Sequence, residues 1–297
     1  MDKRADIKTG FMCNNNCLFC VQADNKCKGN RSFEEIKKDL EETRKRCDGL
    51  VLTGGEVTIR KDFFEIIKIA KKLGFKNIMI QTNGRLFCNK KFCEKTIEAG
   101  ANQFSPAIHG YCSEQHDSLT RAPGSFKQTI QGIKNLKNLG ANVVTNTVVV
   151  KQNYKDMPKI ANLLIKLDVD QFQFAFVHPM GNAWKNFEEV VPNISEAAPY
   201  IHEGLLIGIK NEKRVMAEAM PYCLMQGFEA FVAEIFIPKT EVRGKKYQNT
   251  NDFTKVRKLY GKAKFPQCKQ CKYDNICEGP WREYPTIRGI KEFKPVK

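Results

Sequence analysis

The chain has 297 residues, of which 42% are hydrophobic and 28% charged, as in an ordinary globular protein with one large domain or one large and one small. No stretch approaches the roughly 18 consecutive apolar residues of a membrane-spanning helix. The charged start leads into no apolar segment of a secretory signal, so a cytoplasmic protein is expected. The net charge of +16 fits either lysines on solvated helix faces or attraction to nucleic acid, an anionic membrane or an acidic peptide.

A unit of short apolar run, turn and helical segment recurs through the first 180 residues. Apolar residues at i, i+3, i+4 and i+7 predict helices between the apolar runs, as at Phe63, Ile66, Ile67 and Ala70. Alternating strands and helices predict βαβ crossovers and a parallel sheet, either curled into a partial barrel or wound as an open sheet. Functional sites then gather at the carboxyl ends of the strands. Six strands are predicted, at 5–12, 49–53, 76–82, 102–108, 142–150 and 170–177.

The pattern changes after about residue 180. A helix is predicted over 195–210 with Ser195 as its N-cap. Two further strands, at 215–220 and 230–237, are predicted to form a hairpin around Cys223. Residues 239–264 are polar, basic and poorly periodic, which predicts a flexible loop that contacts the substrate.

The first notable motif is a CxxxCxxC group directly after the first predicted strand, formed by Cys13, Cys17 and Cys20. Clustered cysteines in a reducing compartment favour metal binding or catalysis over disulfides. Three thiolates on one loop leave a four-iron cluster with one iron open to another ligand. The alternative is a zinc site that Cys27 completes as the fourth thiolate.

A second cysteine group lies near the C-terminus. Cys268, Cys271 and Cys277, with Cys223 upstream, can hold either zinc or an iron–sulfur cluster, and their spacing does not separate the two. The five other cysteines are interpreted as small buried hydrophobic residues: Cys27, Cys47, Cys88, Cys93 and Cys112. Of these, Cys27 and Cys112 are the first candidates for a role as reactive thiols.

The CxxxCxxC loop has an aromatic residue, Phe19, immediately before its last cysteine, and with this feature it resembles the signature of the radical S-adenosylmethionine (SAM) superfamily. The resemblance implies that Cys13, Cys17 and Cys20 ligate a 4Fe–4S cluster whose open iron binds SAM. Reduction of that cluster would cleave SAM to methionine and a 5′-deoxyadenosyl radical, which abstracts a hydrogen atom from the substrate.

Motifs farther along the chain strengthen the resemblance. Gly54-Gly55-Glu56 resembles the family's SAM-binding GGE motif, and Thr82-Asn83-Gly84 resembles its turn near SAM, although each alone fits a plain turn. Ala107 stands where relatives often carry a serine that contacts SAM. The resemblance implies cofactor contacts from Phe19, Gly54, Gly55, Glu56, Thr82, Asn83, Arg121 (for the SAM carboxylate) and Asn146 (for the ribose, or else a strand cap).

The C-terminal Cx2Cx5C group resembles the SPASM/Twitch extensions, which hold auxiliary 4Fe–4S clusters. A full SPASM motif continues with another cysteine a few residues later, but here no cysteine follows Cys277 and Trp281 stands in that place. One auxiliary cluster on Cys223, Cys268, Cys271 and Cys277 is therefore expected. Residues 1–182 are therefore interpreted as a partial (β/α)6 radical SAM barrel, and residues 190–297 as a small α+β Twitch-like domain.

The resemblance implies an oxidative radical reaction with an external electron donor. Relatives with this extension often modify ribosomally synthesised peptides, and the basic charge suits an acidic leader peptide. Because only 12 residues precede Cys13, a separate partner protein is expected to present the peptide. The alternatives are a radical SAM enzyme for a small molecule or cofactor precursor, and a zinc-stabilised nucleic-acid-binding protein. No catalytic residue is identified; His178, Trp184 and Tyr111 are named only because they follow predicted strands, and the histidines also fit structural roles.

Overall fold

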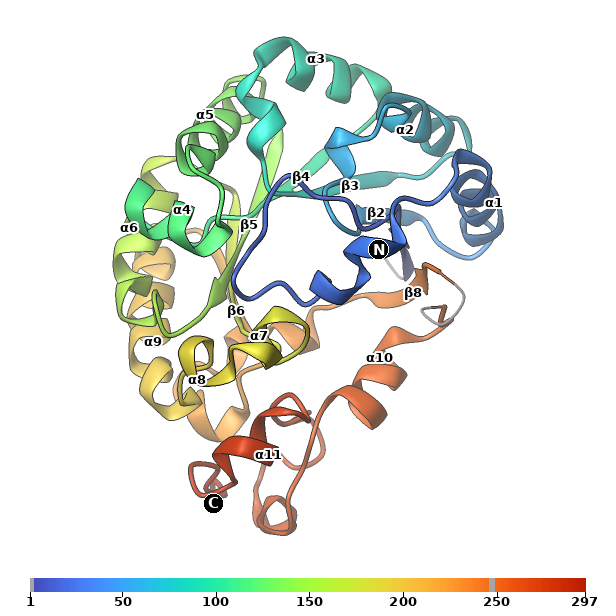
Figure 1. Ribbon diagram of the computed structural model, residues 1–297. Helices are drawn as coiled ribbons and strands as arrows, with labels where there is room; N and C mark the ends of the chain where they lie inside the picture. Colours follow the sequence, from blue (N-terminus) through green and yellow to red (C-terminus); the bar gives the residue numbers. More distant parts are fainter. Residues whose placement is uncertain (1–2, 246–248) are drawn as a thin grey trace.

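A computed structural model describes residues 3–245 and 249–297. Eight parallel strands of these residues form one sheet in the order β7-β6-β5-β4-β3-β2-β1-β8, which curves into a half-barrel (Figure 1). The strands are β1 (Lys3–Lys8), β2 (Gly49–Thr53), β3 (Asn77–Thr82), β4 (Gln103–Pro106), β5 (Asn142–Val149), β6 (Gln171–Phe176), β7 (Arg214–Glu218) and β8 (Lys239–Arg243).

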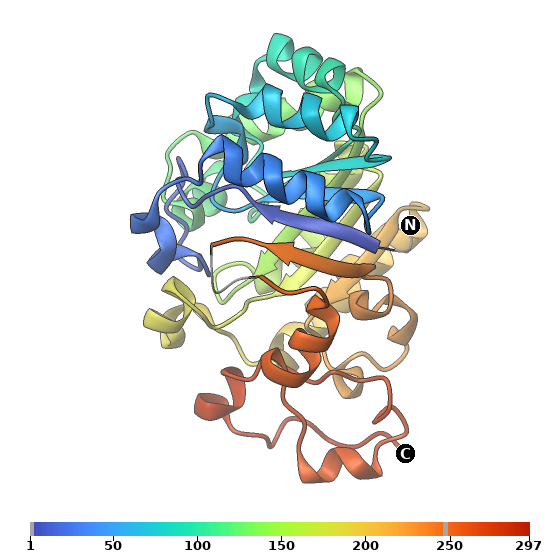
Figure 2. The same cartoon turned by 90° about the vertical axis from the view of Figure 1, so that its right-hand side faces the viewer.

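Helices cover the outer side of the sheet, and the loop after β1 crosses the opening of the half-barrel at the carboxyl ends of the strands (Figures 1 and 2). The segment from α10 to the C-terminus gathers at one end of the sheet, away from α2 and α3 (Figure 2). The helices are α1 (Phe33–Arg44), α2 (Phe63–Lys72), α3 (Lys90–Ala99), α4 (Ser113–Thr120), α5 (Ser125–Asn138), α6 (Met157–Lys166), α7 (Asn182–Lys185), α8 (Phe187–Val190), α9 (Ile194–Lys210), α10 (Phe253–Val256) and α11 (Tyr284–Arg288).

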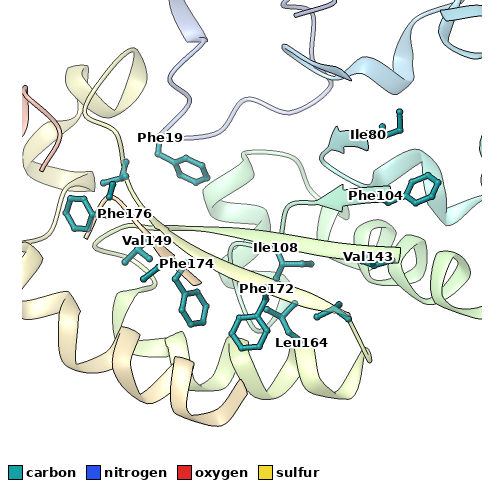
Figure 3. Packing of buried hydrophobic residues seen from close by; sticks show 14 of the residues in the cluster. Phe19, Ile80, Phe104, Ile108, Val143, Val149, Leu164, Phe172, Phe174 and Phe176 are labelled. Carbon is teal, nitrogen blue, oxygen red and sulfur yellow. The ribbon is translucent and has the colours of Figure 1, made fainter. Parts of the chain in front are cut away.

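The two faces of the sheet differ in chemistry because side chains alternate along each strand. On β6, Phe172 and Phe174 are fully buried and pack with Leu164 of α6 (Figure 3). Gln171 and Gln173 of the same strand line cavities on the inner side. The apolar core therefore lies between sheet and helices, and the inside of the half-barrel is polar.

All six strands predicted before residue 180 are present, within a few residues of the predicted bounds. The helix predicted over 195–210 is α9, but it begins after Asn193, and the backbone N–H of Ser195 donates to the Glu292 carboxylate instead of Ser195 capping the helix.

The predicted hairpin around Cys223 is wrong. β7 pairs with β6, and the apolar run at 230–237 forms two short 3-10 helices, Glu229–Phe231 and Ala233–Ile235. The carboxylate of Glu234 in this run accepts from the backbone N–H of Ala219 and pairs with Lys262 at 3.0 Å, which holds the run as a turn.

The loop predicted over 239–264 is also wrong at its start, because β8 pairs with β1 there. Its sequence, Lys-Thr-Glu-Val-Arg, looks exposed, yet Glu241 is fully buried. Its carboxylate contacts Lys3 at 3.2 Å, Arg46 at 2.6 Å and Arg243. Pairing of the Glu241 carboxylate with cations allows this charged segment to form a largely buried edge strand.

Candidate active site

A cavity of about 400 Å³ lies at the carboxyl ends of the strands, under the loop that follows β1. Its wall includes the three thiols of the cysteine loop, Cys13, Cys17 and Cys20, and the ends of β1, β2, β3, β5 and β6. The structure therefore brings together the first cysteine motif and most of the polar residues predicted beside it.

The three thiols are half-buried and electrostatically coupled. Burial, with Cys20 and Cys13 nearby, raises the pKa of Cys17 to about 12. Burial likewise raises the pKa of Cys13, although the backbone N–H of Asn15 donates to its sulfur at 3.4 Å. These thiols keep their protons until a cation replaces them, so metal binding here releases protons.

Polar side chains outside the motif hold the cysteine loop in place. Arg85 donates to the carbonyl of Asn14 at 2.6 Å and to the side chain of Asn15 at 2.8 Å. Lys26 donates to the Asn15 carbonyl at 3.0 Å. Arg85 and Lys26 were missed by the sequence analysis, because nothing in their local sequence indicates contacts with this loop.

The loop is also held from the far edge of the cavity. The Asn182 side chain donates to the Cys17 carbonyl at 2.9 Å, and its backbone N–H donates to the Cys20 carbonyl at 3.0 Å. α7, which begins at Asn182, therefore docks on the cysteine loop.

Gly54 and Gly55 line the cavity. They must be glycines because the backbone of residues 10–12, which leads into the cysteine loop, packs directly against them. The N–H groups of Gly55 and Glu56 each donate at 2.8 Å, to the carbonyls of Gly10 and Met12. A Cβ on Gly55 would lie 2.2 Å from the Met12 carbonyl oxygen, and one on Gly54 2.2 Å from that of Gly10.

Gly55→Ala is therefore expected to cost about 2–3 kcal/mol of stability, as overpacking against backbone does, and to reduce iron incorporation. Gly261→Ala is the matched control, because a Cβ there meets its nearest atom at an ordinary 3.7 Å. Urea unfolding and iron content of both variants measure the effect. Equal stability of the two variants would contradict the close approach.

The carboxylate of Glu56 joins β2 to the turn after β3. It accepts from the hydroxyl of Thr82 at 2.7 Å and from the backbone N–H of Asn83 at 2.6 Å. It also accepts from the backbone and hydroxyl of Thr58. Burial raises the pKa of Glu56 against these hydrogen bonds. The predicted GGE and Thr82-Asn83 motifs thus form one hydrogen-bonded unit at the cavity wall.

Asn146 of β5 has a side-chain oxygen that is buried without a hydrogen-bond partner among the described residues, and the residue lines the cavity. Such an orphaned acceptor needs a donor. A ribose hydroxyl is a suitable donor, so the predicted contact between Asn146 and SAM fits this wall. Phe19 is also placed as predicted, buried at the cavity and edge-on to His109 at 4.8 Å.

Arg121 is not brought to the cavity. It is exposed at the C-terminal end of α4 and lines a shallow surface groove with Asp117 and Pro123. The structure gives no geometric basis for its predicted contact with the SAM carboxylate.

His109, which lines the cavity, and His116, which accepts a hydrogen bond from the His109 backbone, are structural. The N–H of Val148 donates to Nδ1 of His109 at 3.2 Å, and the N–H of His109 donates to Nδ1 of His116 at 3.1 Å. Both rings are therefore neutral with the proton on Nε2. Burial lowers the pKa of His116 to about 4 and holds that of His109 well below its usual range.

These histidines predict an acid-sensitive fold. Because the pKa of His116 is lower in the folded state, the unfolded state binds more protons between pH 6.5 and about 4. Stability is thus complete above pH 6.5 and falls as the pH drops, by about 2 kcal/mol between pH 7 and 5 from this residue alone. Urea unfolding of wild type and His116→Gln at both pH values checks this, since the variant is expected to lose that part of the pH dependence. Identical pH dependence in both would contradict it.

Of the three residues named after strand ends, only His178 lines the cavity. Trp184 and Tyr111 are 45% and 37% exposed. The His178 ring stacks on Trp281 with centroids 3.8 Å apart, and the ammonium of Lys262 lies 4.0 Å from the Trp281 centroid on this aromatic stack. The Trp281 indole N–H donates to the Phe176 carbonyl at 3.3 Å.

The second cysteine group surrounds a separate, small cavity of about 30 Å³, lined by Cys223, Cys268, Cys271 and Cys277. Backbone N–H groups of Phe265 and Val296 donate to the sulfurs of Cys268 and Cys271, each at 3.4 Å. Burial raises the pKa of Cys223 to about 12, with further increments from the other three thiols. Although distant in sequence, the four thiols thus face one site.

Among residues 3–245 and 249–297, no three His, Cys, Asp or Glu side chains converge closely enough to hold a single metal ion. The four thiols would therefore hold a larger group as they stand, or would have to move inward around one ion.

The five remaining cysteines do not share one environment. Cys47 and Cys93 are buried as predicted, Cys112 is intermediate, and Cys27 and Cys88 are exposed, contrary to the prediction. Cys27 lies outside the cavity wall that holds Cys13, Cys17 and Cys20. Within the described part of the chain, no helix has both the length and the apolar character required to cross a membrane.

Comparison with known proteins places this site in a family. The model described as "Radical SAM superfamily" matches residues 7–164. An AdoMet-dependent heme synthase from Methanosarcina barkeri is 31% identical over 183 residues, which are 61% of this chain and 52% of the relative, so the chain spans about half of that protein. A probable GTP 3′,8-cyclase from Saccharolobus islandicus is 28% identical over 239 residues, 78% of this chain and 73% of the relative.

Solved structures share the fold. SuiB from Streptococcus suis, bound to precursor peptide SuiA, has a TM-score of 0.67 at 16% identity, covering 93% of this chain and 71% of SuiB. Native anSMEcpe with bound AdoMet has a TM-score of 0.70 at 15% identity, covering 94% of this chain and 89% of that protein. At these identities, the likeness is evidence of a common fold alone.

Proposed function

The chain belongs to the radical SAM superfamily and is an enzyme, and on this premise we propose that it cleaves SAM reductively and abstracts a hydrogen atom from a polar substrate inside the half-barrel. One observation carries the proposal. Three coupled thiols, the Glu56 carboxylate unit and the unpartnered oxygen of Asn146 all face one cavity of about 400 Å³.

The family implies a 4Fe–4S cluster and SAM, and the residues present fit both. Cys13, Cys17 and Cys20 would hold the cluster, which supplies the electron that splits SAM into methionine and a 5′-deoxyadenosyl radical. Glu56 has an acceptor position left for the SAM ammonium, and Asn146 an acceptor for the ribose. Buried Phe11 and Phe19 at the wall exclude water from this end of the cavity.

We also propose an auxiliary 4Fe–4S cluster on Cys223, Cys268, Cys271 and Cys277, in a Twitch-like segment within residues 190–297. Four thiols around one site and N–H groups directed at two sulfurs support it, since such hydrogen bonds tune cluster potentials. β7 and β8 also come from these residues and extend the sheet of residues 1–182. The proposed segment is therefore continuous with the barrel sheet.

The stacked rings of His178 and Trp281 link the second cysteine group to the cavity of about 400 Å³ beside the cysteine loop, the proposed SAM cavity. Trp281 follows Cys277 by four residues, packs on His178 and lines this cavity with it. An auxiliary cluster in this position gives an oxidative reaction an electron acceptor close to the substrate. An external donor would supply the electron for SAM cleavage.

We propose a ribosomally synthesised peptide, presented by a partner protein, as the first candidate substrate. The second candidate is a small molecule or cofactor precursor. It is favoured by the heme synthase and the GTP cyclase, which match at 28–31% identity, against 15–16% for SuiB and anSMEcpe. Family membership overturns the zinc-stabilised nucleic-acid-binding alternative as the chain's main activity.

The proposal is tested by reducing anaerobically reconstituted protein with dithionite in the presence of SAM. Release of 5′-deoxyadenosine that depends on both reductant and protein is the expected result. Iron-loaded protein that releases none under these conditions would contradict the proposed activity.

A further inference from the structure

The half-barrel contains a second chamber below the SAM cavity, with a volume of about 620 Å³. It lies toward the amino ends of the strands, where Arg4, Asn77, Gln103, Gln171 and Arg214 line it. The two spaces share wall residues: Asp6, Gln81, Asn146 and Glu218. A ligand can therefore span both.

Arg4 is the unusual member of this wall. Its Nε donates to the hydroxyl of Thr240 at 3.1 Å, and no carboxylate of the described residues lies within ion-pair distance of its guanidinium. Burial lowers the pKa of Arg4. The buried arginines Arg60 and Arg257 each have a carboxylate partner at short range, Asp62 and Glu278, both at 2.6 Å.

A half-buried cation whose nearest carboxylates, Asp6 and Glu218, lie beyond ion-pair distance is only partly compensated. A guanidinium matches carboxylate or phosphate oxygens in a bidentate fork. The carboxylates nearest along the wall are already engaged. Asp6 accepts from the Thr53 hydroxyl and lies 3.7 Å from Lys8. Glu218 accepts from Gln173, and burial together with Glu234 raises its pKa. Arg214 adds a second cation to the chamber wall.

We infer that the lower chamber binds an anionic group of the substrate, a carboxylate or a phosphate, against the Arg4 guanidinium. This deepens the proposed function and rests on it. From Arg4 to Lys8, whose side chain reaches the SAM cavity, β1 rises about 13 Å at the usual 3.3 Å per residue. The anionic group of the substrate is thus separated from the reacting carbon by about that distance. The amides of Asn77, Gln103 and Gln171 supply further donors around the anion.

The test measures binding of two probes, pyrophosphate and glutarate, to reconstituted protein with SAM at 150 mM salt by isothermal titration. At least one probe is expected to bind, with Arg4→Met weakening it at least tenfold and Arg4→Lys weakening it less. Pyrophosphate binding assigns a phosphate, and glutarate binding a carboxylate. Lys166→Met, which removes one exposed charge of α6, is the control. It should bind the probe as wild type does.

The inference would be overturned if neither probe bound. It would also be overturned if Arg4→Met bound a probe as tightly as wild type, since the anion would then bind elsewhere on the basic surface. Release of 5′-deoxyadenosine is measured on the same preparations. Active protein without probe binding contradicts this inference alone, whereas probe binding by inactive, iron-loaded protein contradicts the proposed function alone. Circular dichroism and iron content establish that Arg4→Met and Arg4→Lys are folded.

Discussion

Replacing Cys13, Cys17 and Cys20 together with alanine is expected to abolish the dithionite-dependent release of 5′-deoxyadenosine from SAM. The three thiols share one cavity wall, and Cys20 and Cys13 help to raise the pKa of Cys17, so they form a single binding unit. Mutating residues that only hydrogen-bond to metal ligands typically lowers metal affinity or activity by about 10–100-fold. Removing the ligands themselves is more severe, so 5′-deoxyadenosine release should fall by at least about a hundredfold. Chromatography of the reaction products measures it.

Cys27→Ala is the matched control for this triple variant. Cys27 is an exposed cysteine close in sequence to the motif, and it lies outside the cavity wall. Its loss should leave 5′-deoxyadenosine release intact. Wild type that binds zinc and releases no 5′-deoxyadenosine, with the zinc lost in Cys27→Ala, would instead support the four-thiolate zinc alternative at this loop.

The double variant Cys268→Ala/Cys271→Ala separates the two proposed clusters. It removes half of the ligands around the second site, so about four of eight irons should be lost. SAM cleavage should continue because the cysteine loop and Glu56 are untouched, while oxidative turnover of substrate stops. Iron analysis and 5′-deoxyadenosine release measure both effects.

Cys88→Ala is the control for the double variant, since Cys88 is exposed and lines neither cavity. Retention of all iron in the double variant, with loss of zinc instead, would show that the second site holds zinc. Loss of SAM cleavage together with the iron would show that the two sites are not independent.

The sequence predicted the fold well where burial follows simple periodicity. Each of the six strands predicted in the first 180 residues either alternates apolar with polar residues or is a continuous apolar run, and all six are present. β8 was missed because Glu241 reads as exposed, although Lys3 and Arg46, far away in the sequence, neutralise it inside the fold. Local patterns contain no record of such distant partners.

In the candidate site, too, local motifs were predicted correctly, whereas positions that depend on distant contacts were not. The cysteine loop, Glu56, Thr82, Asn83 and Asn146 gather at one cavity, because the carboxyl ends of parallel strands meet at one edge. The position of Arg121 depends on the left-handed turn at the end of α4, which directs the chain to the surface and which the motif around it does not reveal. Arg85, Lys26 and Arg4 act through contacts made only after folding, so the sequence did not single them out.

One chain is proposed to hold two 4Fe–4S clusters, and the iron and sulfide content of anaerobically reconstituted protein is the measurement that tests this claim. We expect about eight irons and eight sulfides per chain, falling to about four of each when Cys13, Cys17 and Cys20 are replaced. About four irons in wild type, falling to none, would remove the auxiliary cluster. Zinc without iron in the reconstituted protein would contradict the claim altogether.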